Sequence, residues 1–242
     1  MRWDRSKGRP EPVAALDKIP LIECGEPLVN IRDACPSVRL PRPQTIPYCR
    51  RRVAEMAEAA ARALPSGMFL AVTDAWRPLL RQQLIYEFMT RSAKEAYSDR
   101  QGAVLTRTVN RWVAPPNRKA PPGHCTGAAI DVMLLDANDV PIDVSSPYDR
   151  IQGGPTYVYG LTEEAWTNRM ILVEAMLAAG FSNCRDEWWH YSFGEAGWAV
   201  RLGYSTCFYG HVELDPNLYA EQQRLWEEAL RERPNPFLPE PK

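Results

Sequence analysis

The chain has 242 residues, of which 45% are hydrophobic and 24% charged, the usual balance of a globular protein. This composition excludes a disordered chain and a collagen-like repeat. Its 29 basic and 30 acidic residues give a formal net charge of −1. Nothing in this charge balance predicts a surface for nucleic acid or for an anionic membrane.

The N-terminus predicts no export signal, because its charged first ten residues are not followed by an apolar segment. The longest strongly apolar stretches, residues 68–72 and 171–179, are far shorter than the ~18 residues that a membrane span needs. The six cysteines form no CxxC pair and show no disulfide spacing. Reduced thiols and a cytoplasmic location are therefore expected.

The first half of the chain predicts two helices and one strand. Residues 1–18 are polar and contain several prolines, so we expect a loosely ordered lead-in. Apolar residues at helical spacing predict a helix over residues 48–64. The apolar run 68–73 predicts a buried strand, and Pro78 can open a second helix. Four prolines make residues 113–123 a stiff loop.

The second half predicts two more strands and two more helices. The strands are residues 128–135 and the aromatic run 187–193. The helices are residues 163–179, which Thr162 can cap, and a last one from Asp215 to about residue 233. Strands and helices are mixed without a regular βαβ order, so we predict an α+β fold.

His124 and Asp131 form the first candidate group. His124 lies in a glycine-containing loop, and Asp131 interrupts the apolar strand seven residues later. An isolated buried carboxylate is costly, so Asp131 must be paired or bound to a metal ion. Two interpretations follow. Either both side chains converge on one ion, or Asp131 pairs with an arginine and His124 is an ordinary hydrogen-bonded loop residue.

Glu187 and His190 form the second group. His190 lies in an apolar, aromatic segment, where a neutral imidazole suits zinc. Glu187 precedes it by three residues, a spacing that places the two on opposite faces of an ideal strand. Both can serve one site only if Glu187 lies at an irregular start of the strand. Two histidines and one carboxylate are typical of a hydrolytic zinc site, and HExxH is absent, which excludes the thermolysin type.

Arg77 is the third candidate, at the end of the strand 68–73 in the segment DAWRP. The following proline favours an extended backbone, which fixes the direction of the arginine. A fixed guanidinium beside a zinc site can stabilise an oxyanion. The spacing agrees equally well with a structural ion pair between Arg77 and Asp74.

The segments DAWRP, GHCTGAAID and EWWHY, in this order, resemble the zinc D-alanyl-D-alanine dipeptidases, the family that includes the vancomycin-resistance dipeptidases. That family carries an S-x-H-x-x-G-x-A-x-D segment followed by E-W-W-H, and here Glu187 follows Asp131 by 56 residues. The resemblance implies one zinc ion per chain, with His124, Asp131 and His190 as ligands. It also implies Glu187 as general base and acid and Arg77 as stabiliser of the transition state.

The same resemblance implies an antiparallel sheet flanked by helices, the fold shared by DD-peptidases and Hedgehog domains. It implies a small dipeptide as partner, with neither nucleic acid nor membrane, and Asp149 as the carboxylate that receives the substrate's amino group. In two places the chain departs from the family. Pro122 replaces a serine that helps to hold the substrate, and Thr126 replaces a basic residue.

These observations predict three segments and one leading function. Residues 1–18 form the lead-in, residues 19–194 a zinc peptidase domain, and residues 195–242 an extension with an added helix. The leading hypothesis is zinc-dependent hydrolysis of a D,D-dipeptide such as D-Ala-D-Ala in peptidoglycan metabolism. A D,D-carboxypeptidase or cell-wall endopeptidase of the same fold is one alternative, although such enzymes normally carry an export signal. A zinc-stabilised binding module is another, but it predicts loss of the general base.

Overall fold

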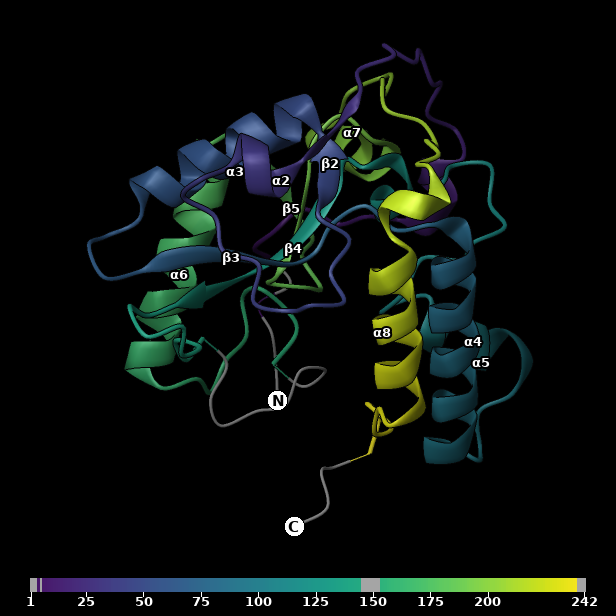
Figure 1. Ribbon diagram of the computed structural model, residues 1–242. Coiled ribbons are helices and arrows are strands. Elements are labelled where there is room, and N and C mark those ends of the chain that lie inside the picture. Colours follow the sequence, from purple (N-terminus) through teal and green to yellow (C-terminus); the bar gives the residue numbers. More distant parts are fainter. Residues whose placement is uncertain (1–3, 5, 145–152, 239–242) are drawn as a thin grey trace.

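Four strands from distant parts of the chain form the central sheet (Figure 1). The computed structural model describes residues 4, 6–144 and 153–238. The strand order is β3-β4-β6-β5, and every neighbouring pair is antiparallel. The strands are β3 (Phe69–Asp74), β4 (Ala129–Leu135), β5 (Ser182–Asn183) and β6 (His190–Ser192). The predicted α+β class with an antiparallel sheet is confirmed.

The main core lies between this sheet and two helices, α3 (Arg51–Ala63) and α6 (Glu163–Ala178) (Figure 1). Side chains alternate between the two faces of a strand, so Ile130 and Val132 of β4 enter the core. Asp131, between them, faces the opposite side, where it lines a cavity. One face of β4 thus stabilises the fold, and the other is available for chemistry.

The helix expected over residues 48–64 is shorter, because its first three residues form a strand instead. β2 (Tyr48–Arg50) pairs antiparallel with β1 (Leu28–Asn30), and α3 follows directly. The short helix α2 (Ile31–Ala34) lies between these two strands in the chain, with Asn30 as its N-cap.

Three further helices lie together at one end of the sheet (Figure 1). They are α4 (Leu79–Ala96), α5 (Gly102–Val109) and α8 (Ala220–Arg231). Their small core contains Phe88 and Met89 of α4, against which Leu230 of α8 packs. The helix predicted after Pro78 is confirmed. The last helix begins at Ala220 instead of near Asp215, because Asp215 caps a separate turn, η2 (Pro216–Leu218).

The beginning of the chain packs against a late helix. α1 (Val13–Leu16) lies against α7 (Ala196–Leu202), and Leu16 joins a small core around Trp198. The side chain of Glu195 caps α7, because it accepts hydrogen bonds from the first backbone N–H groups of that helix. No helix among residues 4, 6–144 and 153–238 is long and apolar enough to cross a membrane.

Candidate active site

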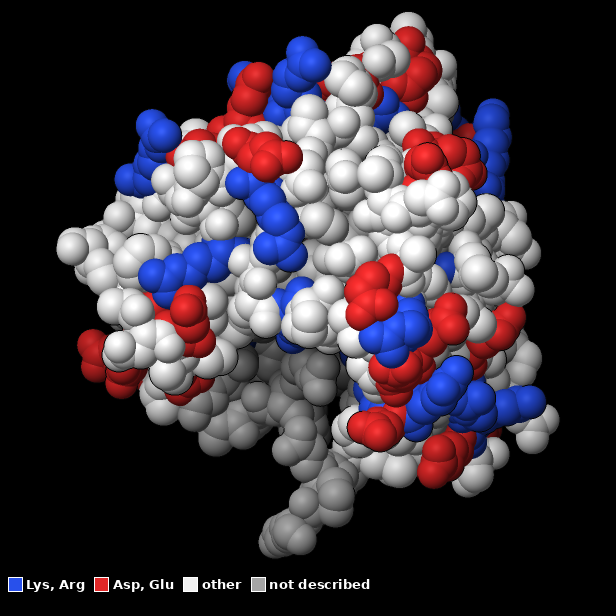
Figure 2. Space-filling model, in the orientation of Figure 1, with Lys and Arg blue, Asp and Glu red and all other residues white. Residues whose placement is uncertain are grey.

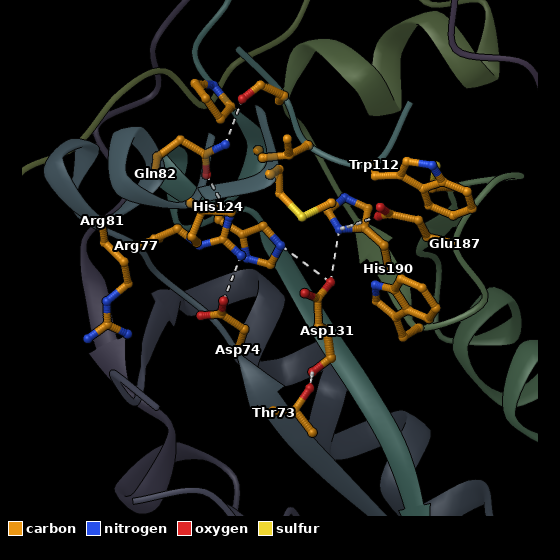
Figure 3. Close-up of a pocket in the computed structure, with 18 of the residues that line it drawn as sticks. Thr73, Asp74, Arg77, Arg81, Gln82, Trp112, His124, Asp131, Glu187 and His190 are labelled. Atoms are coloured by element: carbon orange, nitrogen blue, oxygen red, sulfur yellow. Dashed lines mark hydrogen bonds and ion pairs between the residues drawn. The ribbon is translucent and has the colours of Figure 1, made fainter. Parts of the chain in front are cut away.

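The two predicted histidines and Asp131 come together on the open face of the sheet (Figure 3). Asp131 and His190 are directly opposite each other in the β4–β6 pair. His190 Nδ1 lies 3.0 Å from Asp131 Oδ1, and His124 Nε2 lies 3.3 Å from the same oxygen. In the described part of the chain Asp131 is ion-paired with histidines and with no arginine, so the geometry favours convergence on one ion.

His124 is held by backbone contacts on both sides. It lies in a short 3-10 turn, η1 (Gly123–Thr126), which Gly127 ends with a φ of 69°. Its Nδ1 lies 2.8 Å from the carbonyl oxygen of Ala75, and its own carbonyl accepts a hydrogen bond from the backbone N–H of Arg77 at 3.2 Å. A carbonyl can only accept, so Nδ1 carries the proton and the lone pair of Nε2 faces Asp131.

This arrangement fits a zinc ion. A neutral histidine nitrogen and a carboxylate oxygen are both acceptors, and they repel each other unless a cation lies between them. Tetrahedral zinc, with bonds of about 2.0–2.2 Å, places ligand atoms about 3.3–3.6 Å apart. The distance between His124 Nε2 and Asp131 Oδ1 matches this value, and all three ligand atoms lie within 4.8 Å of one another. His211 is not part of the group and lies 3.4 Å from Glu213 instead.

The electrostatics of Asp131 agree with a permanently ionised ligand. Burial by itself would raise the pKa of this carboxyl, whereas the positive charge of His124 and His190 in their protonated forms lowers it well below its usual range. A cation bound between Asp131 and the neutral imidazoles acts in the same direction. A carboxylate that stays ionised at every physiological pH is always available to a metal ion.

Glu187 lies beside the cluster because the chain turns before β6 begins. The strand predicted over residues 187–193 extends only from His190 to Ser192, and residues 187–189 form a turn. Asn183 holds this turn, since its Nδ2 donates to the carbonyls of Glu187 at 3.1 Å and His190 at 3.0 Å. The turn brings Glu187 Oε2 to 4.0 Å from His190 Nδ1. Glu187 thus lies at an irregular start of the strand, which is the condition under which Glu187 and His190 can serve one site.

Glu187 is a partly buried carboxyl, 16% exposed, next to another carboxylate. Burial raises its pKa well above the usual value, and the charge of Asp131 raises it further, whereas Arg77 lowers it. A cation in the neighbouring cluster acts in the same direction as Arg77 and favours the ionised form. The side chain is thus placed to exchange a proton within the cavity.

Arg77 is fixed from two sides, and the structure contains the ion pair with Asp74. Its Nη2 lies 2.6 Å from Asp74 Oδ2, and its Nη1 donates to Gln82 Oε1 at 2.6 Å. The arginine is 8% exposed and lines the cavity, and its Nε has no partner among the described residues. It forms the structural ion pair at the wall of the cavity. An irregularity in β3 between Val72 and Asp74 places Asp74 opposite Asp131.

Gln82 was not among the site residues predicted from the sequence. This residue is 1% exposed in the first turn of α4, and its Nε2 donates to the carbonyl of Ala114 at 2.7 Å. It therefore joins Arg77 to the proline-rich loop that leads to His124. An amide on the inward face of an amphipathic helix is the signal that could have identified it.

The cluster opens into a cavity of about 780 Å³. Pro122 is buried at the start of η1, where its carbonyl accepts a hydrogen bond from Cys125 N at 2.9 Å. Pro122 also lines the cavity next to His124. Asp149, predicted to bind the substrate's amino group, lies outside the described residues.

Zinc hydrolases hold their ion with three protein ligands of this kind and keep one coordination position for water or substrate. The site belongs to this class. Comparison with known sequences then identifies the family: the profile of the D-Ala-D-Ala dipeptidases matches residues 45–211. The chain belongs to this family of peptidases.

Two curated dipeptidases agree with this assignment. A D-alanyl-D-alanine dipeptidase of Synechocystis is 30% identical over an alignment that covers 81% of this chain and 95% of the relative. The Escherichia coli D-alanyl-D-alanine dipeptidase is 26% identical, over 64% of this chain and 72% of the relative. Among solved structures, VanYB in complex with D-alanine-D-alanine matches with a TM-score of 0.44 and 15% identity, over 84% of this chain and 92% of that one.

Proposed function

We propose that the protein hydrolyses the peptide bond of a free D,D-dipeptide such as D-Ala-D-Ala, with one zinc ion per chain. The observation that carries this proposal is the convergence of His124, Asp131 and His190, with Glu187 4.0 Å from His190. Membership of the dipeptidase family supports the choice of substrate. A binding module would need no partly buried glutamate beside its metal ligands.

Five residues contribute to the reaction: three hold the zinc ion, and Glu187 and Arg77 act on the water and the substrate. When bound, zinc supplies a Lewis acid that polarises the scissile carbonyl and lowers the pKa of the attacking water toward ~7. Glu187 accepts the proton of that water and passes it to the leaving amine, so the same carboxyl acts first as base and then as acid.

Arg77 stabilises the negative charge that develops on the carbonyl oxygen. Asp74 and Gln82 hold its two terminal nitrogens, so the guanidinium needs no reorganisation during the reaction. The two carboxylates nearby also keep it charged: burial lowers the pKa of Arg77, but Asp74 and Asp131 together raise the pKa above its ordinary value. Comparable donors contribute about 2.7–4 kcal/mol to transition-state stabilisation.

A panel of dipeptides with and without a chelator tests this function. We expect turnover of D-Ala-D-Ala, none of L-Ala-L-Ala, and loss of activity on chelation. Glu187→Gln should retain zinc and lower kcat by at least ~10²-fold, the low end for a positioned acid and base. Glu174→Gln, at an exposed position of α6, is the matched control. Wild-type kcat in Glu187→Gln would place the base elsewhere.

We also propose a cytoplasmic location. All six cysteines lie in the described part of the chain, and none forms a disulfide. Unpaired thiols, four of them buried, suit a reducing compartment. Cell fractionation with a periplasmic and a cytoplasmic marker enzyme tests this proposal, and recovery of the protein with the periplasmic marker contradicts it.

A further inference from the structure

The cavity continues beyond the metal cluster into a space between α4 and α8, which we call the outer compartment. It is lined by six apolar side chains from the two helices and from the segment after α5: Ile85, Met89, Trp112, Val113, Trp226 and Leu230. The same cavity reaches the cluster past Arg77 and Gln82. The compartment is therefore a part of the active-site cavity and not a separate pocket.

The apolar face of α8 is incompletely covered by protein. Trp226 and Leu230 are only half-buried, and no residue of this helix is fully buried. The opposite face of α8 is charged, with Arg224 paired to Glu221 at 2.7 Å and to Glu228 at 2.6 Å. In Figure 2 acidic and basic side chains alternate over this helix. Its apolar face thus points toward α4 but borders open space.

Polar contacts hold α8 at this distance from α4. Arg81 donates to the backbone oxygen of Gln222 and to the side-chain oxygen of Gln223, both at 2.9 Å. Beyond the helix, Asn235 donates to the backbone oxygen of Ser92 at 2.9 Å. These bonds fix the two helices relative to each other. Leu230 packs against the core around Met89, and the cavity borders the same side chains, so it lies beside this contact.

The charges around the cluster set the direction of a bound dipeptide. In Figure 3 Arg77 and Arg81 lie on one side of the cluster and Glu187 on the other. Arg81 is 1% exposed, and among the described residues it forms no ion pair. Its hydrogen bonds go to neutral oxygens, and Asp74 and Glu227 act on it only beyond ion-pair distance. The charge of Arg81 therefore remains available to the substrate's carboxylate. The carboxyl-terminal residue then lies toward the outer compartment.

We propose that the outer compartment receives a large apolar or aromatic side chain on the carboxyl-terminal residue of the dipeptide. This inference rests on the proposed function. Cavities of about 300–1,000 Å³ hold ligands of drug size, and a dipeptide whose side chains are two methyl groups leaves most of this one unfilled. Substrates such as D-Ala-D-Phe and D-Ala-D-Leu fill it with apolar surface.

Turnover of three dipeptides tests the inference. We expect kcat/KM for D-Ala-D-Phe to exceed that for D-Ala-D-Ala by at least about tenfold, the effect of burying one aromatic side chain. The reversed dipeptide D-Phe-D-Ala should show no gain. Turnover of D-Ala-D-Ala with an equal or lower kcat/KM for D-Ala-D-Phe overturns the inference but leaves the proposed function standing. A larger gain for D-Phe-D-Ala also overturns it.

A variant that fills the compartment provides a second test. Ala229 lines the cavity from an exposed position of α8, so Ala229→Trp should fold and should reduce kcat/KM for D-Ala-D-Phe to that for D-Ala-D-Ala. Glu228→Trp, the adjacent position on the charged face, is the matched control and should preserve the preference. A preference that survives Ala229→Trp overturns the inference.

Binding separates this inference from the hydrolytic function. In calorimetry with the Glu187→Gln protein, D-Ala-D-Phe should bind at least about tenfold more tightly than D-Ala-D-Ala. This measurement is independent of turnover. Equal affinities overturn the inference, whereas absence of hydrolysis by the wild-type protein would count against the proposed function alone.

Discussion

Removal of the Gln82 side chain tests how Arg77 is held. The amide accepts a charge-assisted hydrogen bond from Arg77 at 2.6 Å and donates one to Ala114 at 2.7 Å. Bonds to charged groups contribute about 1.5–3 kcal/mol and neutral ones about 0.5–1.5 kcal/mol. Gln82→Ala should therefore lower the free energy of unfolding by about 2–4 kcal/mol, measured by urea denaturation.

The effect on catalysis should be confined to kcat. Without Gln82 the Nη1 of Arg77 loses its partner, and the guanidinium is held by Asp74 alone. A shift of about 1 Å in a positioned group can cost ~10²-fold in rate. We expect kcat for D-Ala-D-Ala to fall by about 10–100-fold with KM within about threefold, because Arg77 acts in the transition state.

Two variants distinguish a role of Gln82 in positioning Arg77 from a general loss of folding stability. Gln82→Glu keeps an acceptor for Arg77 and should restore most of kcat, although it cannot donate to Ala114. Gln83→Ala, the exposed neighbour whose amide contacts Glu87 at 3.0 Å, should leave kcat and stability unchanged. A folded Gln82→Ala protein with wild-type kcat would refute the positioning role.

Three further predictions follow from the site. His124→Ala should reduce the zinc content, measured by atomic absorption, to near zero, and one retained equivalent would contradict the ligand assignment. N-acetyl-D-Ala-D-Ala should have a kcat/KM at least ~10²-fold below that of the free dipeptide, because a blocked amine leaves its carboxylate partner unpaired, and equal turnover would favour a carboxypeptidase. Gly127→Ala places a Cβ against Leu28 at a φ of 69°, whereas Gly67→Ala has open space at a φ of 86°. Denaturation should show Gly127→Ala to be at least ~1 kcal/mol more destabilising, and equal losses would exclude a steric constraint there.

Two residues of the metal cluster were predictable because they contrast with their surroundings in the sequence. Asp131 is a carboxylate within an apolar strand, and His190 is an imidazole within an aromatic one. A buried charge needs a partner, and this requirement can be recognised without coordinates. From the sequence, Glu187 could be placed at the site only on the condition that the strand begins irregularly. Whether the strand begins before or after it depends on Asn183, whose hydrogen bonds to the turn are tertiary contacts.

Other parts of the structure depend on contacts between distant segments. β1 and β2 have three residues each, too few for a periodic pattern, and β2 replaces the beginning of the predicted helix 48–64. The last helix was predicted to begin at Asp215, but the hydrogen bond that this side chain accepts from the backbone N–H of Asn217 closes only one 3-10 turn. Nothing local indicates that α8 returns to face α4, because the bonds of Arg81 to Gln222 and Gln223 span more than 140 residues.

The pairing of β4 with β6 has a consequence for folding accuracy. β6 has three residues, so few backbone hydrogen bonds determine how it aligns with its neighbour. A slip of one residue would turn every side chain of β6 to the other face of the sheet and remove His190 from Asp131. An ion bound by both residues therefore favours the native alignment over every slipped one. Zinc binding thus stabilises the native register of β4 and β6 in addition to its part in catalysis.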